Sequence, residues 1–252
     1  MIDNYNKNGF VVLRKYFNHN ELNVLRDDIS TYHKSWTRLN KDAYLNGVIN
    51  TAYLTKKGAM NDSARLRLFK FIASNKVVGI TSTLFKISPA FMNTQLFFDP
   101  INTHQANYWH RDPQYHLSLA EQKAALSGPQ VIHVRIPLFD EPGVELVPQS
   151  HLRWDTEEEL AVRCQTGGHK NNEALETGVR VELEAGDVLI FSANMIHRGL
   201  YGKDRLALDI LFCEPDPSLL SFIDAESLPS KEMLSQFDHP EFFREHSKGD
   251  SS

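Results

Sequence analysis

The sequence predicts a mainly β fold, a β-sandwich or barrel, with α-helices flanking it in the N-terminal third of its 252 residues. Two observations support this prediction. Before about residue 86, apolar residues recur at the three- and four-residue spacing of amphipathic helices. From about residue 91 onward, short apolar runs alternate with clusters of proline, glycine and asparagine, as strands alternate with turns. No internal repeat and no linker divides the chain, so one domain over residues 1–252 is expected.

The first predicted elements are a short strand and three helices. Residues 9–17, Gly-Phe-Val-Val-Leu-Arg-Lys-Tyr-Phe, are rich in the aromatic and β-branched side chains that favour a strand. Asn18 or Asn20 can begin the helix that follows, because an asparagine side chain accepts hydrogen bonds from free backbone N–H groups. The apolar residues that recur on one face of this helix are Leu22, Leu25 and Ile29. Two further helices are predicted at 62–74 and 76–86.

The remainder of the chain contains the predicted strands of the β-structure. Their ranges are 91–98, 130–138, 144–148, 179–183, 187–191 and 205–213. The polar segment 152–176 is predicted to be a helical turn followed by a mobile excursion from the β-structure. The chain after residue 240 has little to bury, and its end, after about residue 245, is expected to be disordered.

Charge and composition exclude several classes of partner. The net charge is −5, and acidic and basic residues are interspersed, whereas a nucleic-acid surface needs clustered lysine and arginine. No segment approaches the roughly 20 apolar residues of a membrane span, and no signal-like apolar run opens the chain, so a soluble cytoplasmic protein is expected. Cys164 and Cys213 have no metal-binding spacing and are expected to be ordinary buried thiols.

Three histidine-x-acid triplets are candidate metal-binding motifs: His19-Asn-Glu21, His110-Arg-Asp112 and His239-Pro-Glu241. Chance alone gives roughly 0.7 H-x-D triplets in a chain of this composition, so their context has to separate them. The first lies where a helix is predicted to begin, and the third lies in a polar segment without a strand. The second follows a predicted strand and an aromatic pair, and in extended chain two residues that are two positions apart point the same way. The sequence therefore favours the second triplet.

A second histidine from a distant strand would complete a facial triad, the ligand set of two histidines and one carboxylate that holds non-haem iron(II). His197 is the best candidate, because it follows the turn Gly186-Asp187 and the predicted buried strand 188–191. Together with His110 and Asp112 it would occupy one face of an octahedral ion and leave three positions open for a cosubstrate and dioxygen. A structural zinc site would need four ligands, and no cysteine supports one.

Arg205 begins a predicted strand eight positions after His197 and is the candidate anchor for a carboxylate ligand. Arg205, Ala207 and Asp209 share one face of that strand, whereas the other face is wholly apolar. A guanidinium that faces a pocket can bind a carboxylate through two parallel hydrogen bonds. Holding the distal end of 2-oxoglutarate requires such a group while the keto-acid end chelates iron.

These segments, taken in order, resemble the phytanoyl-CoA dioxygenase family of iron(II)- and 2-oxoglutarate-dependent oxygenases over nearly the whole chain. The segments that carry the resemblance are Gly9-Phe-Val-Val-Leu-Arg with Leu22 and Leu25, Arg65 to Phe85, His110-Arg-Asp112, Glu141-Pro-Gly143 with Val147-Pro-Gln-Ser-His151, and Gly186-Asp-Val-Leu-Ile-Phe with His197 and Arg205. Gln149 and Pro142 replace a glycine and an asparagine that are usual in the family's turn. The step from His197 to Arg205 is also shorter than is usual.

The resemblance implies a double-stranded β-helix, a jelly-roll or cupin-like fold, with iron(II), 2-oxoglutarate and dioxygen as cofactors. It implies the same three iron ligands and the same arginine anchor, and it points to Gln95 and His133 as neighbours of the cosubstrate. Asp112 is present, whereas halogenating relatives lack this carboxylate, so hydroxylation of a C–H bond with release of succinate and CO2 is the expected reaction. A cupin-like metal-binding protein or isomerase that does not turn over 2-oxoglutarate is the alternative.

The predicted substrate is a small molecule. The candidate contacts for it are Arg135, Arg111, Tyr115 and His104. This mixture suggests a polar or anionic compound, and a carrier-tethered acyl group is the alternative. Arg135 shares a strand face with His133 and is the second candidate for the 2-oxoglutarate anchor. Arg198 is expected to miss the pocket, because neighbouring residues of an extended chain point to opposite faces and His197 occupies the inner one. The sequence gives no indication of oligomeric state.

Overall fold

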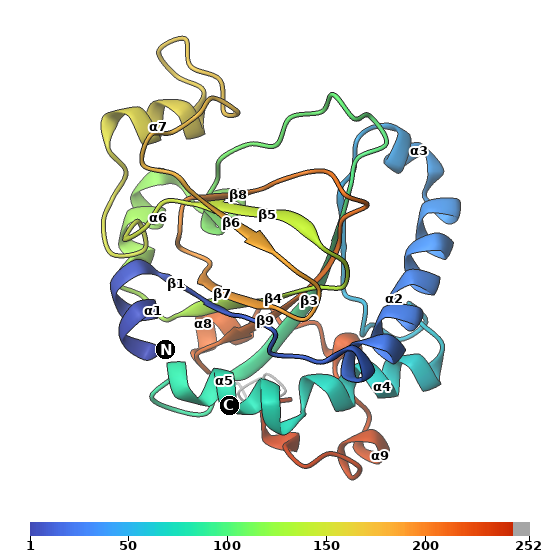
Figure 1. Cartoon of the computed structure of the whole chain (residues 1–252). Helices are drawn as coiled ribbons and strands as arrows, with labels where there is room; N and C mark the ends of the chain where they lie inside the picture. Colours follow the sequence, from blue (N-terminus) through green and yellow to red (C-terminus); the bar gives the residue numbers. More distant parts are fainter. Residues whose placement is uncertain (244–252) are drawn as a thin grey trace, which may run out of the picture.

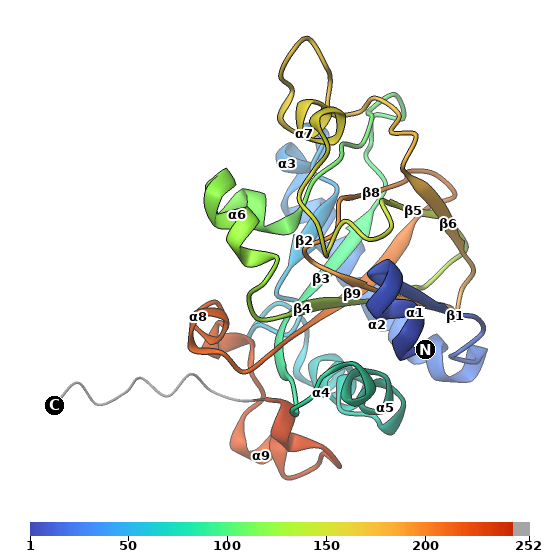
Figure 2. The same cartoon turned by 90° about the vertical axis from the view of Figure 1, so that its left-hand side faces the viewer.

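The computed structural model describes residues 1–243, which form two antiparallel β-sheets surrounded by α-helices (Figure 1). The two sheets face each other, and helices of the N-terminal third lie outside the larger sheet (Figure 2). The predicted disordered tail after about residue 245 lies outside the described residues. No helix in residues 1–243 is long and apolar enough to cross a membrane.

The larger sheet has, within the described residues, six strands in the order β1-β7-β4-β9-β3-β2, and each neighbouring pair is antiparallel. These strands are β1 (Phe10–Leu13), β2 (Asn50–Ala52), β3 (Ala90–Phe98), β4 (Val131–Pro137), β7 (Val188–Ser192) and β9 (Leu206–Cys213). The smaller sheet has the antiparallel order β6-β5-β8. Its strands are β5 (Glu141–Leu146), β6 (Val179–Leu183) and β8 (His197–Gly199). Every strand predicted from the sequence is found, as β1, β3 to β7 and β9.

Helices of the N-terminal third pack on the outer face of the larger sheet (Figure 2). The helices of this region are α1 (Ile2–Asn8), α2 (His19–Leu39), α3 (Lys41–Leu45), α4 (Asp62–Ile72) and α5 (Asn75–Leu84). Asn18 begins α2: its side chain accepts from the backbone N–H of Glu21, and the Glu21 carboxylate accepts from the N–H of Asn18, which makes a capping box. Leu22, Leu25 and Ile29 are buried on the inner face of α2, as predicted. The other two predicted helices are α4 and α5.

The main core lies between these helices and the outer face of the larger sheet. Its members from β4 and β9 are Ile132, Val134, Ile136, Leu206, Leu208, Ile210 and Phe212. Because side chains alternate along a strand, the residues between them face the space between the two sheets. On these two strands the inward residues include His133, Arg135 and Asp209, all buried. The larger sheet therefore presents a dry face to the helices and ionisable groups to the interior.

The space between the sheets is divided into an apolar half and a polar half. The apolar half, beside β1 and β7, is filled by Val144, Leu146, Val181, Leu183, Leu189, Phe191 and Met195. The polar half lies beside β4, β9 and β3 and contains the ionisable side chains. The fold thus confines candidate chemistry to one half of its interior.

Segment 152–176 contains the predicted helical turn, which is α7 (Glu157–Cys164). Val162 and Leu175 of this segment are buried in one cluster with Trp109. The segment is therefore tied to the sandwich by apolar contacts at two points. Its predicted mobility stays a prediction.

Several short elements were not predicted. They are α1, α3, β2, α6 (Leu119–Ala125), β8, α8 (Pro217–Leu220), α9 (Lys231–Leu234) and three short 3₁₀ helices. None of the helices and strands among them exceeds seven residues, which is too short for a hydrophobic period to show in the sequence. Cys164 and Cys213 are both free thiols; Cys213 is buried, as expected, whereas Cys164 is only partly buried.

The end of the described chain corrects one prediction. Residues after 240 were expected to bury little, but Phe242 and Phe243 are both buried. The Phe243 ring lies 5.3 Å from Phe69 of α4 and 5.4 Å from Phe91 of β3, in edge-to-face arrangements. Two aromatic side chains in a polar stretch are enough to extend the core.

A first prediction concerns Gly143, which lies at a shift of register between β5 and β6 with φ +87°. A Cβ at this position would overlap the carbonyl oxygen of Val181. We expect Gly143→Ala to lower the free energy of unfolding by about 2–4 kcal/mol, through backbone strain and disturbed strand pairing. Denaturant unfolding measures it. Gly79→Ala is the control: Gly79 lies in α5 with open space at its Cβ, so this substitution should stabilise by up to about 1 kcal/mol. Equal effects at the two positions would contradict the described register.

Candidate metal centre

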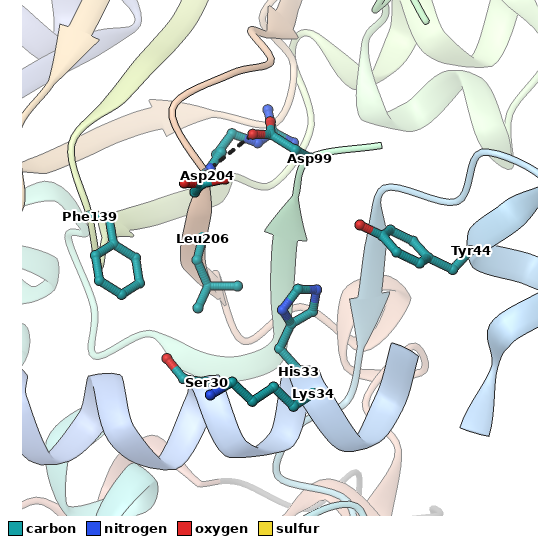
Figure 3. A pocket seen from close by; sticks show the side chains of 9 residues that line it. Ser30, His33, Lys34, Tyr44, Asp99, Phe139, Asp204 and Leu206 are labelled. Atoms are coloured by element: carbon teal, nitrogen blue, oxygen red, sulfur yellow. Dashed lines mark hydrogen bonds between the residues drawn. The ribbon is translucent and has the colours of Figure 1, made fainter. Parts of the chain in front are cut away.

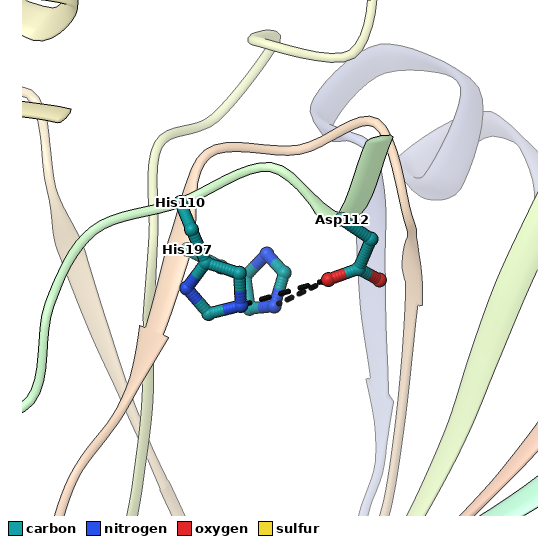
Figure 4. A group of neighbouring side chains, drawn as sticks. All are labelled: His110, Asp112 and His197. Carbon is teal, nitrogen blue, oxygen red and sulfur yellow. Dashed lines mark ion pairs between the residues drawn. The ribbon is translucent and has the colours of Figure 1, made fainter. Parts of the chain in front are cut away.

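His110, Asp112 and His197 come together beside β8, the edge strand of the smaller sheet (Figure 4). His197 begins β8, and His110 pairs with it through two backbone hydrogen bonds of 3.0 and 2.9 Å. Asp112 begins the 3₁₀ helix η1 (Asp112–Tyr115), and its N–H donates to the carbonyl oxygen of Ala193. Backbone pairing between two distant segments therefore brings the three predicted ligands together.

The three ligand atoms surround a gap of the size of a metal ion. Asp112 Oδ1 lies 3.5 Å from His110 Nε2 and 3.7 Å from His197 Nε2. All three atoms lie within 4.8 Å of one another. Ligands about 2.1 Å from one ion are about 3 Å apart in neighbouring octahedral positions and about 4.2 Å apart in opposite ones. A small inward movement would close these atoms around an ion on one face.

Backbone carbonyls orient both histidines. His110 Nδ1 lies 3.2 Å from the carbonyl oxygen of Tyr108, and His197 Nδ1 lies 3.0 Å from that of Met195. Since a carbonyl oxygen only accepts, the proton of each ring sits on Nδ1 and the lone pair on Nε2 faces the gap. Burial lowers the pKa of both rings, that of His197 to about 3. Both imidazoles are therefore neutral near pH 7, as metal ligation requires.

The Asp112 carboxylate uses its second oxygen for His133. Oδ2 lies 2.6 Å from His133 Nε2, and His133 Nδ1 lies 3.2 Å from Asp209 Oδ2. Burial acts to raise the pKa of Asp112, but the charge and hydrogen bond of His133 outweigh it and hold that pKa well below its usual range. Burial likewise acts to lower the pKa of His133, but Asp112 and Asp209 prevail and raise it to about 9.

His133 and Gln95 were predicted as neighbours of the cosubstrate. The structure places His133 against the carboxylate of the metal group and stacks its ring on Phe191, with centroids 4.5 Å apart. Gln95 lies on β3 directly opposite Asp209 of β9, and it is only partly buried. Both side chains therefore belong to the polar half of the interior. The sequence did not reveal the link through Asp209, because that link joins three separate segments.

Arg205 is buried, with 2% of its surface exposed, and among the described residues it forms no ion pair. Nη1 donates to the carbonyl oxygen of Leu200 at 2.9 Å, Nη2 donates to that of Phe98 at 3.4 Å, and Nε has no partner. Burial and the nearby charge of Arg135 lower the pKa of Arg205 to about 10. A buried guanidinium with a free donor fits a carboxylate ligand, which would supply both the charge and the missing acceptor.

Gly199 makes room for this guanidinium. A Cβ on Gly199 would lie 2.6 Å from Arg205 Nη1. Gly199 follows His197 by two residues on β8, so both face the same way and are separated by about 7 Å along the strand. One face of β8 thus contains the predicted ligand His197 and, at Gly199, the space for the guanidinium of Arg205. The distance between the two suits a short dicarboxylate. Gly199 was not among the predicted site residues, although it follows a predicted ligand by two residues.

Arg135, the alternative anchor, pairs with two carboxylates of the protein. Nε and Nη2 lie 2.9 and 3.0 Å from the two oxygens of Glu141, and Nη1 lies 3.0 Å from Asp209 Oδ1. All three residues are buried. The guanidinium therefore joins β4 to β9 and to β5 of the opposite sheet. Carboxylates of the protein bind both sides of its fork, and its role as a substrate contact stays a prediction.

Arg111 points away from the metal group, and all five of its N–H donors have acceptors. These acceptors are the Asp155 carboxylate and the carbonyl oxygens of Ser150, Arg153 and Asn194. Asp155 also pairs with Arg163, which donates to Gln114 of η1 at 2.8 Å. The network supports η1 through Gln114. It corrects the interpretation of Arg111 as a substrate contact, since no donor is left for a ligand.

Tyrosines border the exposed side of the metal group. The ring of Tyr115 lies 5.6 Å from that of His110, and its hydroxyl lies 2.8 Å from the hydroxyl of Tyr108. Tyr115 is 51% exposed, so the pair borders an approach from solvent. Tyr108 was not among the predicted site residues. His104 is exposed in the loop after β3, where its N–H donates to Asn102, and it is not part of the metal group.

A cavity of about 320 Å³ lies between α2, α3 and the start of β9 (Figure 3). Its lining residues are Ser30, His33, Lys34, Tyr44, Asp99, Phe139, Asp204, Arg205 and Leu206. Two of these lining residues are bonded to each other, since the backbone N–H of Arg205 donates to Asp99 Oδ2 at 3.0 Å. None of the three candidate metal ligands lines the cavity, so it is distinct from the metal group.

Two facing antiparallel sheets with a group of two histidines and one carboxylate define a class, β-sandwich proteins able to hold a mononuclear non-haem metal. The chain belongs to the phytanoyl-CoA dioxygenase family, whose model matches residues 5–201. No curated protein matches it in sequence.

Solved structures of similar fold are known. EctD from S. alaskensis with 2-oxoglutarate and 5-hydroxyectoine has 14% identity and a TM-score of 0.60, covering 84% of this chain and 74% of that one. AviO1 from Streptomyces viridochromogenes Tue57 has 18% identity and a TM-score of 0.58, covering 85% and 93%. The non-haem α-ketoglutarate-dependent carbocyclase SnoK from nogalamycin biosynthesis has 14% identity and a TM-score of 0.57, covering 85% and 83%. At these identities the likeness shows the fold alone.

A second prediction tests the metal group. We expect His197→Ala and Asp112→Ala each to lower the affinity for ferrous ion by at least about 100-fold, because each removes one of three ligands, and loss of a mere supporting group already costs about 10–100-fold. Anaerobic competition with a chelator measures the affinity. His239→Ala is the control, since His239 belongs to the competing triplet and bonds to Asn75 instead. Full ferrous affinity in the His197 variant would place the metal elsewhere.

Proposed function

We propose that this protein is an iron(II)- and 2-oxoglutarate-dependent oxygenase that hydroxylates an unactivated C–H bond of a small molecule and releases succinate and CO2. Membership of the phytanoyl-CoA dioxygenase family and the metal-capable His-Asp-His group support this proposal. We propose also that the chain forms one domain with double-stranded β-helix, or jelly-roll, topology. The two facing antiparallel sheets and the likeness in fold to EctD and SnoK support that topology.

The observation that carries the proposal is the unpaired guanidinium of Arg205. A metal-binding protein or a cupin-like isomerase needs the histidines and the carboxylate, but it has no use for a buried arginine that lacks a carboxylate partner. In this chain Gly199 leaves space for that guanidinium on the strand face that also presents His197. The pair of sites matches the two ends of a dicarboxylate that chelates a metal at its keto-acid end.

The residues have separate tasks in this proposal. Iron(II) with 2-oxoglutarate and dioxygen supplies, when bound, the oxidising power that C–H cleavage requires. His110, Asp112 and His197 would hold the ion through one ligand atom each. Arg205 binds the distal carboxylate of the cosubstrate. The apolar cluster beside β7 keeps water away from one side of the group.

The proposed substrate is a neutral small molecule that approaches past Tyr108 and Tyr115. Their rings offer apolar faces and their hydroxyls offer hydrogen bonds, so a ring compound with hydroxyl groups fits this border. An anionic substrate would need a free cation, and the fork of Arg135 and every donor of Arg111 are occupied. A succinate-release screen of neutral ring compounds, with amino acids and acyl thioesters as the comparison, tests the substrate class.

Anaerobic spectroscopy tests the proposed function itself. Addition of iron(II) and 2-oxoglutarate should produce a weak visible charge-transfer band, because the keto acid chelates the metal through two oxygens. The band needs no substrate, so it can be sought before the substrate is known. If the metal is bound and the band is absent, the cupin-like metal-binding protein or isomerase becomes the better assignment.

A third prediction concerns the anchor. We expect Arg205→Ala to raise the dissociation constant of 2-oxoglutarate by roughly 30- to several-thousand-fold, which is the loss of a buried arginine–carboxylate contact of about 2–5 kcal/mol. Ferrous affinity should survive. Gly199→Ala should weaken 2-oxoglutarate binding in the same direction, because its methyl group displaces the guanidinium. Titration of the charge-transfer band measures both.

Arg198→Ala is the matched control for this prediction. Arg198 pairs with Glu145 and stacks on Trp109, so it lies on the face of β8 away from His197, and its loss should leave the titration unchanged. Arg135→Ala should instead destabilise the fold by about 3–5 kcal/mol, since it leaves two buried carboxylates without their partner. If Arg135→Ala weakened 2-oxoglutarate binding in a folded protein and Arg205→Ala did not, the anchor would be Arg135.

A further inference from the structure

We propose that His133 is a positioning residue that makes Asp112 a one-oxygen ligand of the metal, and that Asp209 holds His133 in this role. The inference rests on the proposed function, since it concerns the same metal group. It assigns a task to a buried histidine that neither ligates the metal nor contacts Arg205.

The two oxygens of Asp112 have different surroundings. Oδ1 faces the Nε2 atoms of His110 and His197 at 3.5 and 3.7 Å, distances that leave room for an ion between them. Oδ2 lies 2.6 Å from His133 Nε2, the short distance of a charge-assisted hydrogen bond. One oxygen is therefore available to a metal, while the other is already engaged.

His133 cannot easily turn away from this contact. Its side chain is 3% exposed, and its ring stacks on Phe191 with an angle of 11° between the planes. Its second nitrogen, Nδ1, lies 3.2 Å from Asp209 Oδ2. Rotation of the ring would break two hydrogen bonds to carboxylates and leave buried charges unpaired.

Asp209 is itself fixed by a buried arginine. Its other oxygen, Oδ1, accepts from Arg135 Nη1 at 3.0 Å, and Arg135 is held by Glu141 through two hydrogen bonds. Glu141 belongs to β5 of the smaller sheet, whereas Arg135 and Asp209 belong to β4 and β9 of the larger one. A continuous series of hydrogen-bonded side chains thus runs from Asp112 through His133, Asp209 and Arg135 to Glu141 of the smaller sheet.

The consequence is a fixed number of open positions at the metal. A carboxylate bound through one oxygen leaves three octahedral positions for a chelating keto acid and dioxygen. Without His133, Oδ2 would be free to bind the ion as well, and one of those positions would be lost. His133 would therefore favour cosubstrate binding by holding Oδ2 of Asp112.

A fourth prediction tests this role with His133→Phe, which keeps a ring on Phe191 and removes both hydrogen bonds. We expect the dissociation constant of 2-oxoglutarate, measured anaerobically through the charge-transfer band, to rise at least about ten-fold. Ferrous affinity should change by less than that, because the freed Asp112 offers the ion two oxygens. His133→Gln keeps an N–H donor for Oδ2 and should restore 2-oxoglutarate binding to within about three-fold of the wild type.

Two further variants keep the test decisive. Asp209→Asn should also weaken 2-oxoglutarate binding more than ferrous binding, by a smaller factor than His133→Phe. If His133→Phe does not fold, the Asp209→Asn variant is the test of the positioning role. His151→Phe is the matched control: this histidine lies against Tyr5 and Gly9, away from the metal group, and both affinities should stay unchanged.

The outcomes separate this inference from the proposed function. Unchanged 2-oxoglutarate affinity in His133→Phe, within about two-fold, overturns the positioning role alone. A parallel loss of both affinities that His133→Gln does not restore also overturns it, since general disruption of the site gives that result. A wild-type protein that binds no ferrous ion overturns the proposed function and the inference together.

Discussion

The buried ion pairs of Arg135 are the interaction on which the rest of the site depends. Arg135 joins Glu141 of the smaller sheet to Asp209 of the larger one, and all three side chains are shielded from solvent. Moving such ions out of water costs several kcal/mol each, and only good geometry with further hydrogen bonds offsets that penalty. These ion pairs therefore fix the position of one sheet relative to the other. That placement also sets where His197, on the smaller sheet, lies relative to Arg205, which directly precedes β9 of the larger one.

The alternation of side chains explains why one sandwich contains both a dry core and a polar site. On β4, Ile132, Val134 and Ile136 pack under the helices, while His133 and Arg135 point inward. On the neighbouring β7 both faces are apolar, so its inward residues extend the hydrophobic cluster instead. The boundary between the two halves thus runs between adjacent strands. His133 lies on that boundary, with its ring stacked on a phenylalanine of β7 and both nitrogens bonded to carboxylates.

The sequence was sufficient wherever a local pattern carried the information. Alternation and turn residues predicted the long strands and helices, and the two-residue spacing of His110 and Asp112 predicted that both face one point. The carboxylate partners of the buried arginines could not be predicted in this way. Arg135 and Arg111 look like free cations in the sequence, yet Asp209 and Asp155, which neutralise them, lie 74 and 44 residues further along the chain. Such pairing becomes visible only when the strands are placed side by side.

Arg135 and Arg205 both face the interior, but only Arg135 has carboxylates bound to its guanidinium. Asp99 is close to Arg205, but its two oxygens accept from the backbone N–H groups of Gly202 and Arg205 and so stabilise the turn into β9. The guanidinium is left with carbonyl oxygens and a free Nε. An unsatisfied buried donor costs about 1–3 kcal/mol. An incoming carboxylate would remove that penalty, and a ligand that binds only the folded protein adds its binding free energy to the stability of the fold. Because both oxygens of Asp99 bind backbone N–H groups in this turn, the guanidinium of Arg205 stays a buried cation without a carboxylate partner in the polar half of the interior.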